Sequence, residues 1–230
     1  MLSTPSSLKL IIFDLDGTIL DTVADLADAV IYALEKHGFP PRSYAEVMSF
    51  VGNGVIKLIE RALPDGHKDP ENVEKVYQDF NARYSAHYAD KTVPYEGIPE
   101  LLSALKLQGY KLAVLSNKPD KFTNELITGF FPEVFDIIRG SIDGVPRKPD
   151  PTAELNILAE IGVTPNECLH VGDSDTDILT AHNAGIKCLA CTWGYRPRLT
   201  LEDAGADYIV ESVSEMANFF EKTVAKEFCL

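Results

Sequence analysis

The sequence predicts an α/β protein: a doubly wound, Rossmann-like parallel sheet with an inserted α-helical cap. Short apolar runs recur along the chain, and most are continuous rather than alternating, which is typical of strands covered on both faces. Amphipathic helical patterns lie between many of these runs. A long stretch that contains only helical patterns separates the first run from the second. The alternation predicts the layered core, and the long stretch predicts the cap.

Six apolar runs are the predicted strands of the sheet. They cover Lys9–Phe13, Lys111–Leu115, Val134–Ile138, Cys168–Val171, Lys187–Thr192 and Tyr208–Val210. Two of the helices between them have clear ends. The pattern over Pro99–Gly109 stops at a glycine, and the one over Pro151–Gly162 opens with proline and closes with glycine, the usual asymmetry of helix ends.

The segment between the first two strands is too long for a single crossover, because Asp14 and Ser116 are 102 residues apart. Its apolar residues follow helical spacing, and Ser43 with Glu46 fits a capping box at the start of one helix. We therefore predict a helical cap over residues 22–91, inserted after the first strand. The predicted core domain then consists of residues 1–21 and 92–230.

The composition is that of an ordinary globular protein with an acidic surface. Hydrophobic residues make up 45% of the chain and charged residues 24%, which argues against a disordered or membrane-embedded protein. The 21 Lys and Arg against 35 Asp and Glu give a net charge of −14. This charge argues against nucleic acids and anionic membranes as partners. An anionic ligand would need a metal ion or local cations to reverse the field.

No targeting pattern is visible, so we expect a cytoplasmic protein. The apolar run after Lys9 is interrupted by Asp14 and Asp16, which excludes a signal peptide and a membrane span there. Cys188 and Cys191 have CxxC spacing but no second pair and no nearby histidine, so we expect structural thiols rather than a zinc or redox site. The sequence leaves open whether the chain is a monomer or a homodimer.

Polar residues recur where the predicted strands end, which is where ligands bind in doubly wound sheets. Alone, each segment has a plainer reading as a turn, a helix N-cap or a surface lysine. Together they bring three carboxylates, a hydroxyl, an amide and an ammonium group to one edge of the sheet, and carboxylates without His or Cys favour a hard cation such as Mg²⁺. The segments are Asp14–Thr18, Ser116–Lys118, Arg147–Pro151 and Gly172–Asp177.

These segments resemble the four motifs of the haloacid dehalogenase superfamily, and the resemblance covers nearly the whole chain. Phe13–Thr18 is similar to the first motif, Ser116 to the second, Lys148 to the third and Gly172–Asp177 to the fourth. The dehalogenases of the superfamily lack the second aspartate of the first motif. Because Asp16 is present, the chain resembles the branch that transfers phosphoryl groups.

The resemblance implies a magnesium-dependent phosphomonoester hydrolase. Asp14 would attack phosphorus and form an aspartyl phosphate, which divides a difficult hydrolysis into two easier steps. Asp16 would protonate the leaving alcohol and then deprotonate the attacking water. Mg²⁺ would be held by the Asp14 carboxylate, the Asp16 carbonyl and Asp173. Asp177 would orient Lys148 or a metal-bound water without binding the metal itself.

The remaining implied roles concern the substrate. Ser116 would bind phosphoryl oxygens, and Lys148 would balance charge on the group being transferred. Thr18 and Asn117 are further candidates for substrate binding. His170 lies inside a predicted strand, where we expect a packed, neutral side chain rather than a catalytic base.

The cap loop Val51–Val55 carries the prediction of substrate. Gly52, Asn53 and Gly54 precede a helical pattern, and free N–H groups at a helix start can bind an anion, although a plain inter-helix turn fits the same residues. The loop resembles that of phosphoglycolate phosphatases, which implies that a substrate carboxylate binds there, helped by Lys57 or Arg61.

The most favoured substrate is accordingly 2-phosphoglycolate, hydrolysed to glycolate and phosphate. A phosphomutase of the β-phosphoglucomutase type uses the same aspartate chemistry and stays open. So does a pyrophosphatase, nucleotidase or sugar phosphatase of the same superfamily. A non-catalytic binding protein is the least favoured reading, because all the motif residues are present.

Overall fold

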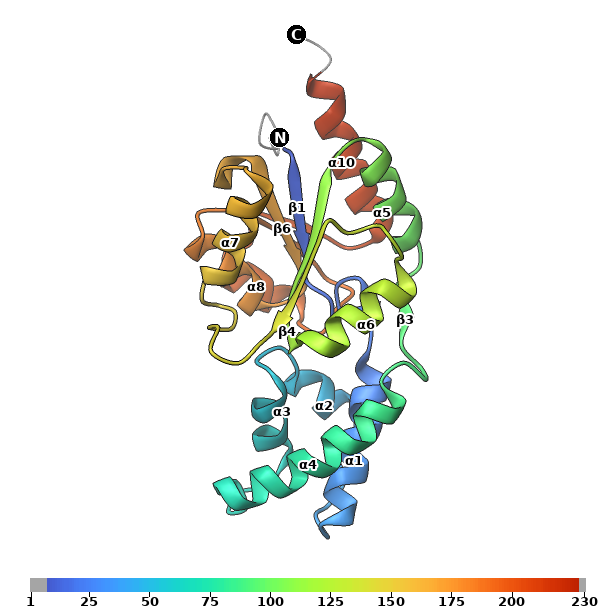
Figure 1. Cartoon of the computed structure of the whole chain (residues 1–230), viewed down its shortest axis with the longest axis vertical. Helices are drawn as coiled ribbons and strands as arrows, with labels where there is room; N and C mark the ends of the chain where they lie inside the picture. Colours follow the sequence, from blue (N-terminus) through green and yellow to red (C-terminus); the bar gives the residue numbers. More distant parts are fainter. Residues whose placement is uncertain (1–7, 228–230) are drawn as a thin grey trace.

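The computed structural model describes residues 8–227 and contains a six-stranded sheet with helices on both faces (Figure 1). The strand order is β5-β4-β1-β6-β7-β8, and all five pairings are parallel, as the continuous apolar runs predict. The strands are β1 Leu10–Phe13, β4 Lys111–Pro119, β5 Ile137–Ser141, β6 Cys168–Gly172, β7 Lys187–Cys191 and β8 Tyr208–Val210. The predicted fold class is confirmed.

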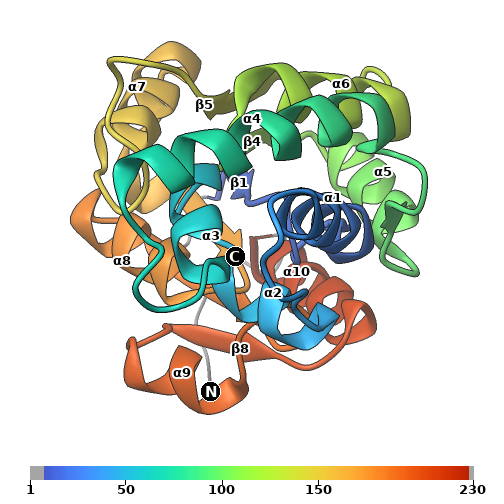
Figure 2. The same cartoon turned by 90° about the horizontal axis from the view of Figure 1, so that it is seen from below.

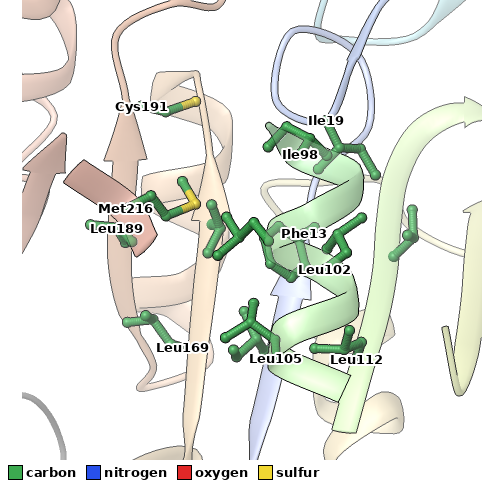
Figure 3. Close-up of a cluster of buried hydrophobic side chains, with 14 of the residues drawn as sticks. Phe13, Ile19, Ile98, Leu102, Leu105, Leu112, Leu169, Leu189, Cys191 and Met216 are labelled. Atoms are coloured by element: carbon green, nitrogen blue, oxygen red, sulfur yellow. The ribbon is translucent and has the colours of Figure 1, made fainter. Parts of the chain in front are cut away.

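Alternate residues of each central strand enter two different cores. In β1, Ile11 and Phe13 join the cluster that Figure 3 shows, where Leu102 and Leu105 of α5 pack against the sheet. Leu10 of the same strand joins the opposite cluster. One face is thus covered by α5 Ile98–Leu107, α6 Asp120–Phe130 and α10 Val213–Glu227. The other is covered by α7 Thr152–Ile161, α8 Asp175–Asn183 and α9 Arg198–Asp203, with a 3₁₀ turn at Pro165–Glu167.

Four helices between β1 and β4 form a separate bundle below the sheet (Figure 1) and lie in front of it in the view of Figure 2. They have their own buried apolar cluster. The helices are α1 Val23–Lys36, α2 Tyr44–Phe50, α3 Val55–Ala62 and α4 Pro70–His87. The predicted capping box is confirmed, because Ser43 accepts from the Glu46 N–H while the Glu46 carboxylate accepts from the Ser43 N–H.

The bundle is joined to the sheet by two chain segments. These pair as a short antiparallel ribbon of β2 Leu20–Asp21 and β3 Val93–Pro94. The carboxyl ends of β1 and β4 point towards the bundle (Figure 1). Because β4 and β6 both pair with β1, the chain segments that follow all three strands meet beside the bundle. This topology creates one site between sheet and bundle.

Two details correct or complete the expectations from sequence. The strand predicted over Val134–Ile138 begins three residues later, at Ile137, because Asp136 accepts from the Leu112 N–H and the lysines beside it and anchors the start of the edge strand. Cys188 and Cys191 are buried free thiols, and they enter opposite cores of the sheet, so they cannot share a metal. None of the helices within residues 8–227 combines the length and apolarity needed to cross a membrane.

Candidate active site

A pocket lies between the carboxyl ends of the strands and the helical bundle. Its polar floor comes from the sheet and includes Asp14, Asp16, Ser116, Asn117, Lys148 and Asp173. Its roof is largely apolar and includes Leu26, Val51, Val55, Leu58 and Phe80. A polar floor under an apolar roof strengthens electrostatic interactions inside, since little water competes for them.

Lys148 connects the first and fourth motifs at the floor of the pocket. Its Nζ lies 2.7 Å from Asp14 Oδ1 and 2.6 Å from Asp177 Oδ1. The Lys148 side chain is 4% exposed and that of Asp177 is 1% exposed, so these ion pairs are shielded from solvent. Residues far apart in sequence therefore form one charge-assisted network.

The charges in this network perturb one another's protonation. Burial raises the pKa of Asp14 to about 6, even though Lys148 opposes the effect. Burial acts on Asp177 in the same direction, but Lys148 and His170 outweigh it and hold the pKa of Asp177 below its usual range. Burial would lower the pKa of Lys148, but the two carboxylates raise it, so Lys148 stays cationic.

Asp173 is held by a cradle of small residues and backbone donors. The Tyr195 N–H donates to Oδ2 at 2.6 Å, and the Thr18 hydroxyl donates to Oδ1 at 3.2 Å. A side chain at Gly17 or Gly194 would bring its Cβ within 2.5 Å or 2.3 Å of the Asp173 side chain. Burial raises the pKa of Asp173 well above its usual range, and Asp177 and Asp14 add to this effect. A carboxylate placed this way needs a cation beside it.

The donor set fits a hard divalent cation. Oxygens of Asp14, Asp173 and Asp177 lie within 4.8 Å of one another. Asp177 is already occupied, because its Oδ1 faces Lys148 and its Oδ2 accepts from the N–H and hydroxyl of Ser174. Asp14 and Asp173 are therefore the side chains suited to hold Mg²⁺, which proteins usually bind through one or two carboxylates, with waters and phosphate oxygens as the other ligands.

Asp16 has a second lysine as its partner. Lys118 Nζ lies 2.9 Å from Asp16 Oδ1, and the Thr22 hydroxyl donates to the same oxygen at 2.5 Å. Burial would lower the pKa of Lys118, but Asp16 and Tyr84 raise it. Both contacts use Oδ1, which leaves Oδ2 for proton transfer. Lys118 lies in the segment Ser116–Lys118 named above, but no sequence pattern predicted its contact with Asp16, 102 residues away.

Ser116 and Asn117 both line the pocket at the end of β4. The Asn117 amide donates to the carbonyls of Gly52 and Lys148 at 2.9 and 3.0 Å, and its oxygen accepts from the Lys148 N–H. Asn117 thus connects the cap loop to the lysine loop. Its polar atoms are already paired, so it holds the two loops in place beside the pocket.

Two candidate substrate-binding residues do not line the pocket. Thr18 is fully buried, and its hydroxyl is used by Asp173, so its role in the structure is to position that carboxylate. Asn53 is turned away: its amide donates to Thr176, and its oxygen accepts from Arg61. Gly52 and Gly54, by contrast, line the pocket, and their positive φ angles of 119° and 84° explain why glycine stands there.

The cation that lines the pocket and also contacts the cap loop is Arg196, which was not singled out from the sequence. Lys57 is 57% exposed and pairs with Glu60, and neither Lys57 nor Arg61 lines the pocket. Arg196 does line it, and its Nη2 donates to the Val51 carbonyl. Its position in the sequence could have indicated this place in the pocket, because Arg196 directly follows Thr192–Tyr195, at the end of a predicted strand.

The expectation of a neutral His170 is wrong. His170 is fully buried between two carboxylates: its Nδ1 lies 2.8 Å from Glu154 Oε1, and its Nε2 lies 3.5 Å from Asp177 Oδ1. Burial lowers its pKa, but the two carboxylates outweigh burial and raise the pKa to about 9. The sequence pattern predicted the buried strand that contains His170. It did not predict that Glu154 of α7 lies against the His170 side chain.

A doubly wound sheet with carboxylates and lysines gathered at its carboxyl edge is suited to metal-assisted phosphoryl transfer. Residues 11–191 match the model of the haloacid dehalogenase-like hydrolase family. The chain belongs to this family, as its four motifs imply.

Individual relatives are phosphoglycolate phosphatases, which are phosphoric monoester hydrolases. That of Nitrosococcus oceani is 33% identical over 93% of this chain and 97% of its own. That of Aliivibrio fischeri is 37% identical over 88% of this chain and 92% of its own. A crystal structure of a predicted phosphoglycolate phosphatase from Lactobacillus delbrueckii subsp. bulgaricus superposes with a TM-score of 0.88, at 33% identity, covering 93% of this chain and 98% of that one.

Proposed function

We propose that this protein is a Mg²⁺-dependent phosphatase that hydrolyses 2-phosphoglycolate through an aspartyl phosphate on Asp14. The observation that carries the proposal is the contact of Lys148 Nζ with Asp14 Oδ1, beside Asp173 in the same pocket. A nucleophilic carboxylate, a buried cation and an acidic metal site lie together. The names of the relatives support the choice of substrate.

Asp14 and Asp173, with the Asp16 carbonyl, are the groups that would hold Mg²⁺. When bound, the ion supplies positive charge that offsets repulsion between the phosphate and Asp14. In the first step an Asp14 oxygen bonds to phosphorus, and the bond to the glycolate oxygen breaks. That oxygen takes a proton from Asp16 Oδ2, which Lys118 and Thr22 hold in place through Oδ1.

In the second step a water attacks the phosphorus of the aspartyl phosphate. Asp16 takes the proton of that water, and the bond to Asp14 breaks, which releases phosphate and restores the Asp14 carboxylate and the protonated Asp16. Ser116 and Lys148 bind the phosphoryl oxygens throughout. We propose that the helical segment 22–91 acts as a cap whose apolar roof excludes bulk water from both steps.

The substrate carboxylate is proposed to bind at the cap loop, between Gly52, Gly54 and Arg196. Arg196 is suited to this role because Lys148 and Lys118 are paired with carboxylates of the floor, whereas Arg196 contacts the loop itself. Arg196 Nε also lies 3.5 Å from Oδ1 of the half-buried Asp175. A guanidinium matches a carboxylate with two parallel hydrogen bonds.

The test is phosphate release from 2-phosphoglycolate beside sugar phosphates, nucleotides, pyrophosphate and p-nitrophenyl phosphate, with Mg²⁺ and with a chelator. We expect kcat/KM to be highest for 2-phosphoglycolate and to vanish with the chelator. Turnover spread evenly over the panel would refute the substrate. Return of the phosphoryl group to a second hydroxyl of a sugar phosphate would indicate a mutase.

A pair of arginine variants tests the carboxylate site. Arg196→Met should lower the ratio of kcat/KM for 2-phosphoglycolate to that for p-nitrophenyl phosphate by about 10–100-fold, the value of a charge-assisted hydrogen-bond pair of about 1.5–3 kcal/mol. Arg198→Met, a matched change at a side chain that is 49% exposed and lies outside the pocket, should leave the ratio unchanged. An unchanged ratio in Arg196→Met would remove Arg196 from carboxylate recognition.

A further inference from the structure

A buried ion pair lies behind the active site, on the far side of Asp177 from the pocket. Glu154 of α7 and His170 of β6 contact each other at 2.8 Å, and both side chains are completely buried. Neither residue lines the pocket. They lie in the core on the α7–α8 face of the sheet, among side chains such as Ile157 and Cys188.

This pair continues the charge network of the floor. Its members alternate in sign from Glu154 through His170, Asp177 and Lys148 to Asp14, and no step between neighbouring charged atoms exceeds 3.5 Å. Because every member is buried, each charge is felt strongly by the next. A column of this kind extends from the body of the core to the proposed nucleophile.

Stability alone does not account for the pair. Removing two charges from water costs about as much as their attraction returns, so an apolar pair in the same space is often as stable or more so. Two polar atoms in the described chain confirm that the local fit is imperfect: Glu154 Oε2 and His170 Nε2 have no hydrogen-bond partner. The unpaired His170 Nε2 is the atom nearest Asp177.

We propose that His170, held by Glu154, is a positioning residue that fixes Asp177 and thereby the ammonium group of Lys148. Lys148 Nζ is shared between Asp14 and Asp177 at nearly equal distances. The positive charge of His170 offsets part of the negative charge of Asp177. Asp177 therefore keeps Lys148 in position but attracts its ammonium group less strongly than an uncompensated carboxylate would. The ammonium group then remains available to Asp14 and to the phosphoryl group. This role rests on the proposed phosphatase function.

The test removes both charges at once. Glu154→Leu with His170→Phe fills the space with apolar groups, so the melting temperature should stay near that of the wild type. We expect kcat for p-nitrophenyl phosphate to fall by about 10–100-fold with little change in KM, as for residues that orient catalytic groups without touching substrate. Cys188→Ala is the matched control: it disturbs the neighbouring position of the same core and should lower stability without lowering kcat.

A second background separates positioning from general disturbance. In an Asp177→Asn protein the double change should add little to the loss of kcat, because the pair acts through Asp177. Should the double variant not fold, Glu154→Gln keeps the shape of the side chain and removes its charge, and it should lower kcat several-fold. The proposal would be overturned by a wild-type kcat in the double variant or in Glu154→Gln. It would also be overturned if the double change lowered kcat as much in the Asp177→Asn background as in the wild type. The ratio of the variant's kcat to the wild-type kcat tests the positioning role, whereas the substrate panel measured on the wild type tests the proposed function.

Discussion

Replacing Asp14 by asparagine should stabilise the metal-free protein at neutral pH while abolishing its proposed activity. Burial raises the pKa of Asp14 from 3.8 to about 6, so between these values the native state holds a proton that the unfolded chain releases. Stability therefore falls as pH rises through this window. At 1.36 kcal/mol for each pH unit, the ionised Asp14 costs the native state about 3 kcal/mol at pH 7.

Thermal unfolding in a chelator, measured from pH 4 to pH 7 on the wild type and Asp14→Asn, isolates this contribution. The two proteins differ in one titrating group, so the difference between their melting temperatures reports Asp14 together with its electrostatic effect on Asp173 and Lys148. It should be small at pH 4 and grow towards pH 7, where about 3 kcal/mol corresponds to about 6–12 °C for a chain of this size.

Magnesium should reverse the order. At about 100 times its dissociation constant, a ligand of the native state adds about 2.7 kcal/mol of stability. The wild type should gain this at pH 7, whereas Asp14→Asn should gain much less because it lacks a charged ligand. A difference in melting temperature that is the same at pH 4 and pH 7 would refute a buried, uncompensated Asp14. An equal response to Mg²⁺ in both proteins would refute its role as a ligand.

Three further changes test other parts of the site. Asp16→Asn should lower kcat by about 10²–10⁴-fold, because it removes the general acid and base, and it should also lower the melting temperature, because it leaves the buried Lys118 without its carboxylate; steady-state kinetics and a thermal melt check the two effects. Lys148→Ala should lower the free energy of unfolding by about 3–5 kcal/mol, measured by denaturant titration, and should also lower activity, because it leaves two buried carboxylates without their cation. An unchanged free energy of unfolding would contradict the ion pairs. Gly194→Ala should weaken Mg²⁺ binding in calorimetry, because its Cβ would lie 2.3 Å from Asp173, whereas Gly109→Ala, at a glycine with open space around it, should not.

The fold was predictable because its signals are local. Continuous apolar runs, a capping box at Ser43 and helices bounded by proline and glycine are properties of short segments. The one strand that was placed wrongly, β5, is an edge strand. Its start is fixed by Asp136, through contacts with Leu112 and with lysines on other elements. Long-range contacts of this kind leave no periodic pattern.

The candidate site was predictable only in part for the same reason. The motif residues stand at the ends of strands, so topology alone brings Asp14, Lys148 and Asp173 together. Their partners do not share that property. Lys118 and Arg196 owe their roles to packing between sheet and cap, and the charge on His170 depends on an acid 16 residues earlier, on a helix.

The charges of the pocket explain how so acidic a chain could accept an anion. Three cationic side chains stand against four carboxylates, a net charge of −1 that would repel a phosphate ester. A bound Mg²⁺ changes the sign to +1, so the metal and the substrate would bind together rather than independently. The groups concerned are Lys118, Lys148, Arg196, Asp14, Asp16, Asp173 and Asp177. Asp14, Asp16 and Asp177 already contact a lysine and Asp173 does not, so the added charge acts mainly beside Asp173, next to Asp14, where the phosphoryl group is proposed to be transferred.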